Sequence, residues 1–159
     1  MEKKNGPIRV LQILFMALLY GQLIFAVLVL ILVKAGLFKA SVDGKTERIF
    51  EIVGLVISFV AVSSALWLFK RKMETVNKII KLEDRFIEYR GACIMKYSLL
   101  EIPSLLSIVF YLLTGKWNFI MIAVALIFIF MGQNPIRQRI KAEMNIDDAQ
   151  VDEINNLQG

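Results

Sequence analysis

A single carboxylate lies inside the four long apolar stretches of this chain, and polar side chains accompany it at helical spacing. Tyr97 precedes Glu101 by one helical turn and Ser104 follows it by another, which places the three on one side of a helix. Pro103 has no backbone N–H, so it frees the carbonyl of Leu99 and favours a kink. A carboxyl group beside a kink and a free carbonyl is suited to holding a proton or a small cation inside a membrane.

The same residues also suit a structural role, in which the carboxyl group joins a network of hydrogen bonds between helices. Gln22 lies near the middle of the first apolar stretch, where an amide needs a partner, and Ser58 lies in the second. Glu101 is only about 7.5 Å along the helix from Lys96, at 1.5 Å per residue. This shallow position, away from the membrane centre, favours the structural role.

Other kinds of catalytic chemistry lack their usual residues. The chain has no histidine, the commonest general base and metal ligand, and its one cysteine, Cys93, cannot form an internal disulfide. No nucleophile stands beside a base, and no set of residues has the spacing of metal ligands. We therefore expect no enzyme activity, no cofactor and no metal site.

Four stretches are long and apolar enough to cross a bilayer as helices. Hydrophobic residues make up 57% of the 159 residues and concentrate at positions 10–33, 52–69, 97–115 and 117–133. A bilayer core of about 30 Å needs roughly 20 helical residues, and unbroken apolar runs exclude the alternating strands of a membrane barrel. The sequence therefore predicts an all-α polytopic membrane protein with four transmembrane helices. The helix at 117–133 is expected to be the most exposed to lipid.

The basic residues are distributed unevenly between the two sides that four spans would create. Fourteen of the 19 lysines and arginines lie in the N-terminal arm, the segment 70–96 and the C-terminal tail, and five lie in the other two loops. By the positive-inside rule, we expect a protein of the inner (plasma) membrane with both termini in the cytoplasm. The net charge of +5 is thus an orientation signal, and no aromatic and basic module points to nucleic acid. The expected partner is the lipid bilayer.

The segment 70–96 is charged but has the apolar spacing of a helix and contains no proline. We expect the second and third helices of a transmembrane domain at 1–134 to extend through it into the cytoplasm. The turn of this helical hairpin is expected near residues 81–84. A helix lying flat on the inner leaflet is the alternative.

A helical cytoplasmic tail, residues 135–159, is expected after the fourth span. Asn134 as a cap and Pro135 in the first turn predict the start of one helix. Asp147 with Gln150 three residues later predicts a second, capped helix directly afterwards.

Part of the chain resembles a known group of proteins. Residues 89–92 (YRGA), 96–103 (KYSLLEIP) and 111–115 (YLLTG) are similar to segments of an uncharacterised family of small four-helix membrane proteins from Bacteroidota-type bacteria. The similarity covers about residues 45–140 and is most specific at 100–103. It implies a four-helix topology and a bacterial origin, but no activity.

A second resemblance concerns the hairpin from Gly54 to Gly115, which is similar to the proton-carrying subunit c of rotary ATP synthases. In that family a glutamate in the second helix of a hairpin binds the ion, which implies the same role for Glu101. The chain departs from the pattern because its helix at 52–69 has a single glycine and Glu101 lies shallow in the membrane. The first and fourth helices would be additions to that hairpin.

Two functions from different classes follow. The first is a non-enzymatic accessory or scaffold protein that acts through helix packing and its cytoplasmic surface, with a membrane-protein partner or a second copy of itself. Gly54, Ser58, Ala61 and Ala65 form a stripe of small residues suited to such packing. The second is a small oligomeric protein that moves protons or cations through Glu101.

Overall fold

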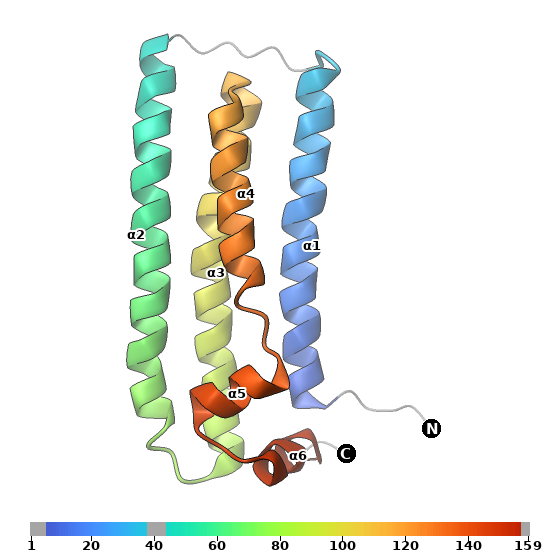
Figure 1. Cartoon of the computed structure of the whole chain (residues 1–159), viewed down its shortest axis with the longest axis vertical. Helices are drawn as coiled ribbons and strands as arrows, with labels where there is room; N and C mark the ends of the chain where they lie inside the picture. The colour runs from blue at the N-terminus through green and yellow to red at the C-terminus, as the bar shows by residue number, and fades with distance from the viewer. Residues whose placement is uncertain (1–5, 38–43, 157–159) are drawn as a thin grey trace.

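The computed structural model describes residues 6–37 and 44–156, and within them the chain is α-helical, which confirms the predicted all-α class. Four helices run alongside one another, and two short ones lie across the end of the bundle at which the first helix begins (Figure 1). The helices are, in chain order, α1 (Pro7–Lys34), α2 (Gly44–Val76), α3 (Leu82–Thr114), α4 (Trp117–Met131), α5 (Arg137–Met144) and α6 (Asp148–Asn156).

Helix α3 is the centre of the arrangement, because it packs against α1, α2 and α4. Helices α1 and α2 lie on opposite flanks of the pair formed by α3 and α4 (Figure 1). Small buried side chains let the helix backbones approach one another. They include Ala65 of α2, Ala92 and Ser104 of α3, and Ala123 of α4. The outward faces of α1 and α2 are left apolar and exposed.

Three of the helices, α1, α2 and α3, are long and apolar enough to cross a membrane. Helix α4 is apolar but has 15 residues. At 1.5 Å per residue it is about 22 Å long, which is less than the thickness of a bilayer core. The predicted stretch 117–133 therefore forms a shorter helix than expected. The helix ends at Met131, and a non-helical linker, residues 132–136, leads on to α5.

The prediction that α4 is the helix most exposed to lipid is not supported, because α4 has a larger buried share than α1 or α2. Its inward face, from Phe119 to Phe130, is buried, and the helix packs chiefly against α3. Helices α1 and α2 bury a smaller share of their residues than α4 does. A run without polar side chains does not reveal how much of its surface neighbouring helices will cover.

The charged segment 70–96 continues the two long helices beyond their apolar parts. Helix α2 extends to Val76 and α3 starts at Leu82, so residues 77–81 make the turn. The predicted helical hairpin is confirmed, with its turn a few residues earlier than expected. A separate helix lying flat is contradicted, because both helices continue without a break.

The tail packs onto the end of the bundle. The predicted cap of α6 is confirmed: the Gln150 N–H donates to Asp147 Oδ1 at 2.8 Å, and the Asp147 N–H donates to Gln150 Oε1 at 3.2 Å. The prediction that Asn134 caps α5 is wrong. Helix α5 begins at Arg137 after the extended Ile136, and no side chain caps it. Five buried side chains of the tail join the hydrophobic cluster that fills this end of the bundle: Ile140, Met144, Ile146, Val151 and Ile154.

Candidate functional site

Two of the residues predicted to form an intramembrane site meet where α1 packs against α3. Ser104 Oγ donates a hydrogen bond to Gln22 Oε1 at 2.6 Å. Both side chains are fully buried, at 0% exposure. The partner that Gln22 needs is therefore a serine of α3, whereas Ser58 of α2 donates within its own helix.

The Ser104 hydroxyl has one hydrogen and two acceptors within reach, since the backbone carbonyl of Glu101 lies 3.1 Å away. The Gln22 Nε2 group is buried and has no hydrogen-bond partner among the described residues. Half a turn of the amide about its last side-chain bond lets Nε2 donate to Ser104 Oγ while the hydroxyl donates to the Glu101 carbonyl. In either arrangement the contact links α1 to α3 in the apolar interior.

Replacing Ser104 with alanine is expected to lower the free energy of unfolding by about 1–2 kcal/mol, because the buried Gln22 amide loses its partner. Thermal unfolding of the purified protein in detergent measures the change. Ser98→Ala removes an exposed serine from the same helix and serves as the control. Gln22→Leu in the Ser104→Ala background should recover part of the loss. Equal effects of Ser104→Ala and Ser98→Ala would contradict the pairing.

Tyr97 binds the linker between α4 and α5. Its hydroxyl donates to the Gln133 carbonyl at 3.3 Å. Its ring makes edge contacts with Phe15 of α1 at 5.3 Å and Phe130 of α4 at 5.7 Å between ring centroids. Tyr97 therefore orients the chain after α4, and its hydroxyl does not reach Glu101.

The linker 132–136 has two further side-chain donors. The Arg139 guanidinium donates to the Gly132 carbonyl, and Gln12 Nε2 of α1 donates to the Pro135 carbonyl at 3.1 Å. Together with the tyrosine contact, these bonds satisfy three carbonyls of a non-helical segment. Such backbone is tolerated at membrane depth where protein groups satisfy it.

Glu101 and Pro103 join neither contact through their side chains. The Glu101 carboxyl is half-buried and forms no hydrogen bond or ion pair with the described part of the chain. Pro103 is buried, and α3 continues through it as one helix. Of the five predicted residues, only Ser104 and Gln22 form a hydrogen bond between their side chains.

A second polar group lies below the apolar stretch 97–115 of α3. Lys96 is 1% exposed although it carries an ammonium group. Its Nζ lies 3.6 Å from the centroid of the Phe69 ring and 3.5 Å from Glu143 Oε1. The aromatic face and the carboxylate both favour a cation here, and they offset part of the cost of removing it from water.

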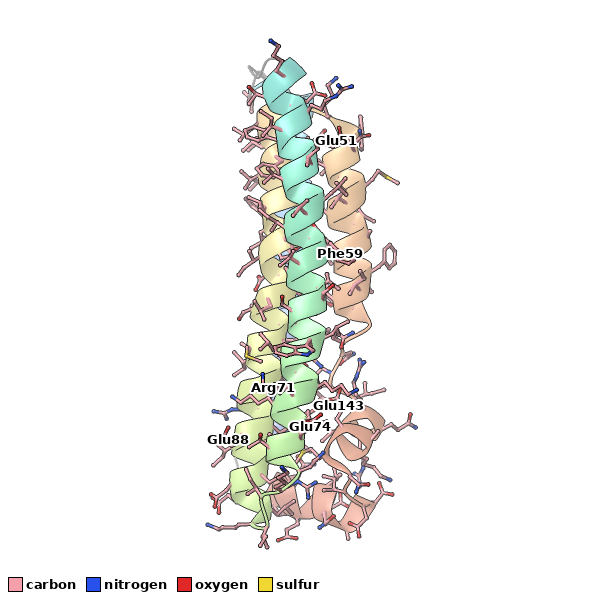
Figure 2. All side chains as sticks on the ribbon, turned by 90° about the vertical axis from the view of Figure 1, so that its left-hand side faces the viewer. Glu51, Phe59, Arg71, Glu74, Glu88 and Glu143 are labelled. Atoms are coloured by element: carbon pink, nitrogen blue, oxygen red, sulfur yellow. The ribbon has the colours of Figure 1, made fainter. Side chains whose placement is uncertain are left out.

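Glu143 of α5 connects the members of this group. Arg139 Nε donates to Glu143 Oε1 at 3.1 Å, and Tyr89 OH donates to Oε2 at 2.6 Å. Asn77 Nδ2 donates to the Glu143 backbone carbonyl at 3.3 Å. Figure 2 shows Glu143 beside the lower part of α2. The basal cluster, which ties α2, α3 and α5 together, consists of Phe69, Tyr89, Lys96, Arg139 and Glu143.

Burial determines the acid–base properties of this region. Loss of contact with water lowers the pKa of Lys96, and the Glu143 carboxylate works against that change. Burial raises the pKa of Tyr89 far above its ordinary value, so its hydroxyl remains a hydrogen-bond donor. Burial also raises the pKa of the neighbouring Cys93 thiol to about 11. Cys93 therefore stays in the unreactive thiol form and lacks the character of an activated nucleophile.

One pattern in the sequence points to the basal cluster. Tyr89, Cys93 and Lys96 recur at spacings of four and three, which places the lysine on a helix face with residues that proteins often bury. The sequence predicts only an orientation charge at Lys96, and its partner Glu143 lies beyond the fourth helix. Only the packing of the tail brings the two together.

Within residues 6–37 and 44–156, no group of three or more His, Cys, Asp or Glu side chains is placed to hold a metal ion. No protein-family model, curated protein or solved structure matches the chain. The two family resemblances therefore stay predictions, and function is inferred from the chain's own residues.

Proposed function

We propose that this chain crosses an inner membrane four times, with both termini in the cytoplasm. The length and hydropathy of α1, α2 and α3 support three crossings. Helix α4 leads back to the end at which α1 begins (Figure 1), and the linker 132–136 extends its path with satisfied carbonyls. Basic residues concentrate toward that end, as expected for a cytoplasmic side.

Single-cysteine labelling tests this orientation. In a Cys93→Ala background, Lys45→Cys at the start of α2 is expected to react with a membrane-impermeant maleimide on intact spheroplasts. Lys78→Cys, in the turn between α2 and α3, should react only after lysis. The opposite pattern would reverse the orientation, and labelling of both positions in intact spheroplasts would contradict a crossing by α2.

Within this orientation, the chain acts as a non-enzymatic accessory or scaffold protein. The observation that carries this proposal is the basal cluster, which fastens the hairpin and the tail into one block at the cytoplasmic end. Lys96 and Glu143, the buried charges of the basal cluster, are paired, whereas the outer surface of the block carries exposed charges such as Arg71, Lys78 and Arg90. A charged surface on a block of fixed shape is suited to selecting a protein partner.

A photo-crosslinking amino acid on this surface tests the scaffold role. A probe at Lys78 or Arg90 should give a discrete adduct in native membranes, either with a partner or with a second copy of the chain. Arg71→Glu should weaken the adduct because it reverses a charge of the same surface. Lys45→Glu at the opposite end is the control and should leave it unchanged. Uncrosslinked monomer at every hairpin position would contradict the role.

Movement of protons or cations through Glu101 is the alternative function. One observation favours it: the Glu101 carboxyl lacks a partner in the described part of the chain, while the nearby Ser104 is paired with Gln22. If Glu101 carries the ion, Glu101→Gln should abolish flux into proteoliposomes, because an amide does not exchange protons or carry a charge. Ser98→Ala should leave the flux unchanged. Equal flux in wild type and Glu101→Gln would rule out this function.

A further inference from the structure

A cleft opens between the lower part of α1 and the linker 132–136. Its volume is about 600 Å³. Its walls combine polar side chains, Arg9, Gln12 and Asn134, with apolar ones, Ile13, Met16 and Ile136. On α1 the polar residues come first and the apolar residues follow toward the membrane, so the cleft changes from cationic to apolar along its length.

Arg9 is the charged group of this cleft. Its guanidinium is exposed and has no carboxylate partner among the residues that the structure describes, and no carboxylate lines the cleft. The arginines of α5 are already engaged. Arg137 is paired with carboxylates of α6, and Arg139 is paired with Glu143. Arg9 is therefore available to an anion from outside the chain.

The depth of the cleft matches the boundary of a bilayer. Arg9 directly precedes the charge-free stretch 10–33, so under the proposed topology it lies at the cytoplasmic surface of the membrane. Ile13 and Met16 follow it within two turns and are exposed. An occupant of this cleft would meet a cation at headgroup level and apolar side chains at the level of the acyl chains.

We propose that the cleft binds one anionic phospholipid, with its phosphate beside Arg9 and an acyl chain along Ile13 and Met16. The change from cationic to apolar walls fits an amphiphile, whereas a free anion would use only the Arg9 end. Gln12 and Asn134 supply polar groups to the headgroup. Only one part of this inference rests on the proposed orientation, namely which leaflet of the bilayer supplies the lipid.

Native mass spectrometry of the full chain in detergent, titrated with phosphatidylglycerol or phosphatidylcholine, tests the site. Phosphatidylglycerol should bind first and more tightly. Arg9→Gln should weaken its binding about fivefold, which corresponds to about 1 kcal/mol for one basic residue near a headgroup. Arg71→Gln removes an exposed arginine from the same side of the membrane and should leave the affinity unchanged.

A second variant tests the apolar part of the cleft. Met16→Trp fills that part and should weaken both lipids while the preference for phosphatidylglycerol remains. Equal losses in Arg9→Gln and Arg71→Gln would overturn the site, as would displacement of the lipid by inorganic phosphate. If cysteine labelling instead places the termini outside the cell and the Arg9 effect persists, the orientation fails and the lipid site stands. If labelling gives the expected orientation but Arg9→Gln does not weaken phosphatidylglycerol binding, only the lipid site is ruled out.

Discussion

Glu143→Ala is expected to lower the free energy of unfolding by about 3 kcal/mol, because it leaves the ammonium group of Lys96 buried without its counter-charge. Lys96 is 1% exposed and its Nζ lies 3.5 Å from Glu143 Oε1, so water cannot replace the carboxylate without opening the contact. The variant also removes the acceptor of Tyr89 OH and Arg139 Nε. Thermal unfolding in detergent, together with trypsin cleavage at Arg137 and Lys141 of α5, measures the loss.

Two variants separate this effect from a general loss of tail charge. Glu153→Ala removes an exposed carboxylate from α6 and should leave stability within about 0.5 kcal/mol of wild type. Lys96→Met combined with Glu143→Leu removes both charges and should recover most of the loss, since buried ion pairs are often replaceable by apolar side chains. A Glu143→Ala protein as stable and as resistant to trypsin as Glu153→Ala would contradict the basal cluster.

The stability of the Glu143→Ala variant should also depend on pH in a defined direction. Burial lowers the pKa of Lys96 in the folded protein, so the unfolded chain binds more protons at this residue than the folded chain does. The free energy of unfolding therefore rises with pH between the folded and unfolded pKa values of Lys96. In Glu143→Ala the carboxylate that raises this pKa is missing, so the pKa of Lys96 in the folded protein falls further. The pH interval over which stability rises is therefore wider in the variant. The deficit of Glu143→Ala relative to wild type should shrink as the pH is raised from 7 toward 10.

Phe130→Ala is expected to have a comparable effect, a loss of about 3 kcal/mol, because it opens a cavity where three aromatic rings meet. Phe130 is 0% exposed. Its ring stacks on Phe15 with centroids 4.9 Å apart and meets the edge of Tyr97 at 5.7 Å. Lipid chains are as apolar as this interior, so the loss comes mainly from packing contacts. Unfolding in detergent by heat or by added SDS measures it.

Phe128 provides the matched control for this substitution. It lies on the same helix two residues earlier and is 67% exposed, so Phe128→Ala removes the same atoms without opening a cavity. Its effect should stay within about 0.5 kcal/mol. Phe130→Leu keeps much of the volume and should cost about half as much as the alanine variant or less. Equal losses at the two phenylalanines would show that the aromatic contact does not hold α1, α3 and α4 together.

The helices themselves could be predicted from local patterns. Apolar runs placed α1 to α4, the helical spacing of 70–96 predicted the hairpin, and Asp147 with Gln150 predicted the start of α6. The need of Gln22 for a partner was also readable, because an unpaired amide is costly in an apolar layer. The identity of the partner was not, because it depends on how far α1 and α3 are shifted along each other.

The basal cluster could not be predicted in the same way. A lysine at the end of an apolar stretch usually marks the membrane surface, and the spacing of Tyr89, Cys93 and Lys96 does not identify a counter-charge that would let the lysine be buried. Its counter-charge comes from α5, whose position depends on where α4 ends. The end of α4 at Met131, in turn, depends on side chains from Tyr97, Arg139 and Gln12 that hold the linker. Such contacts between distant segments have no local signature.

The positions of α1 and α2 on opposite flanks of α3 have a consequence for biogenesis (Figure 1). A chain inserted from its N-terminus places both helices in the membrane before their common neighbour has been synthesised. The partner of Gln22, the Ser104 hydroxyl, lies 82 residues further along the chain and is not yet present at that stage. During that interval the insertion machinery, water or headgroups must satisfy the amide, because lipid chains offer no hydrogen bond. Release of the first two helices into the bilayer should therefore be delayed until α3 has emerged from the ribosome.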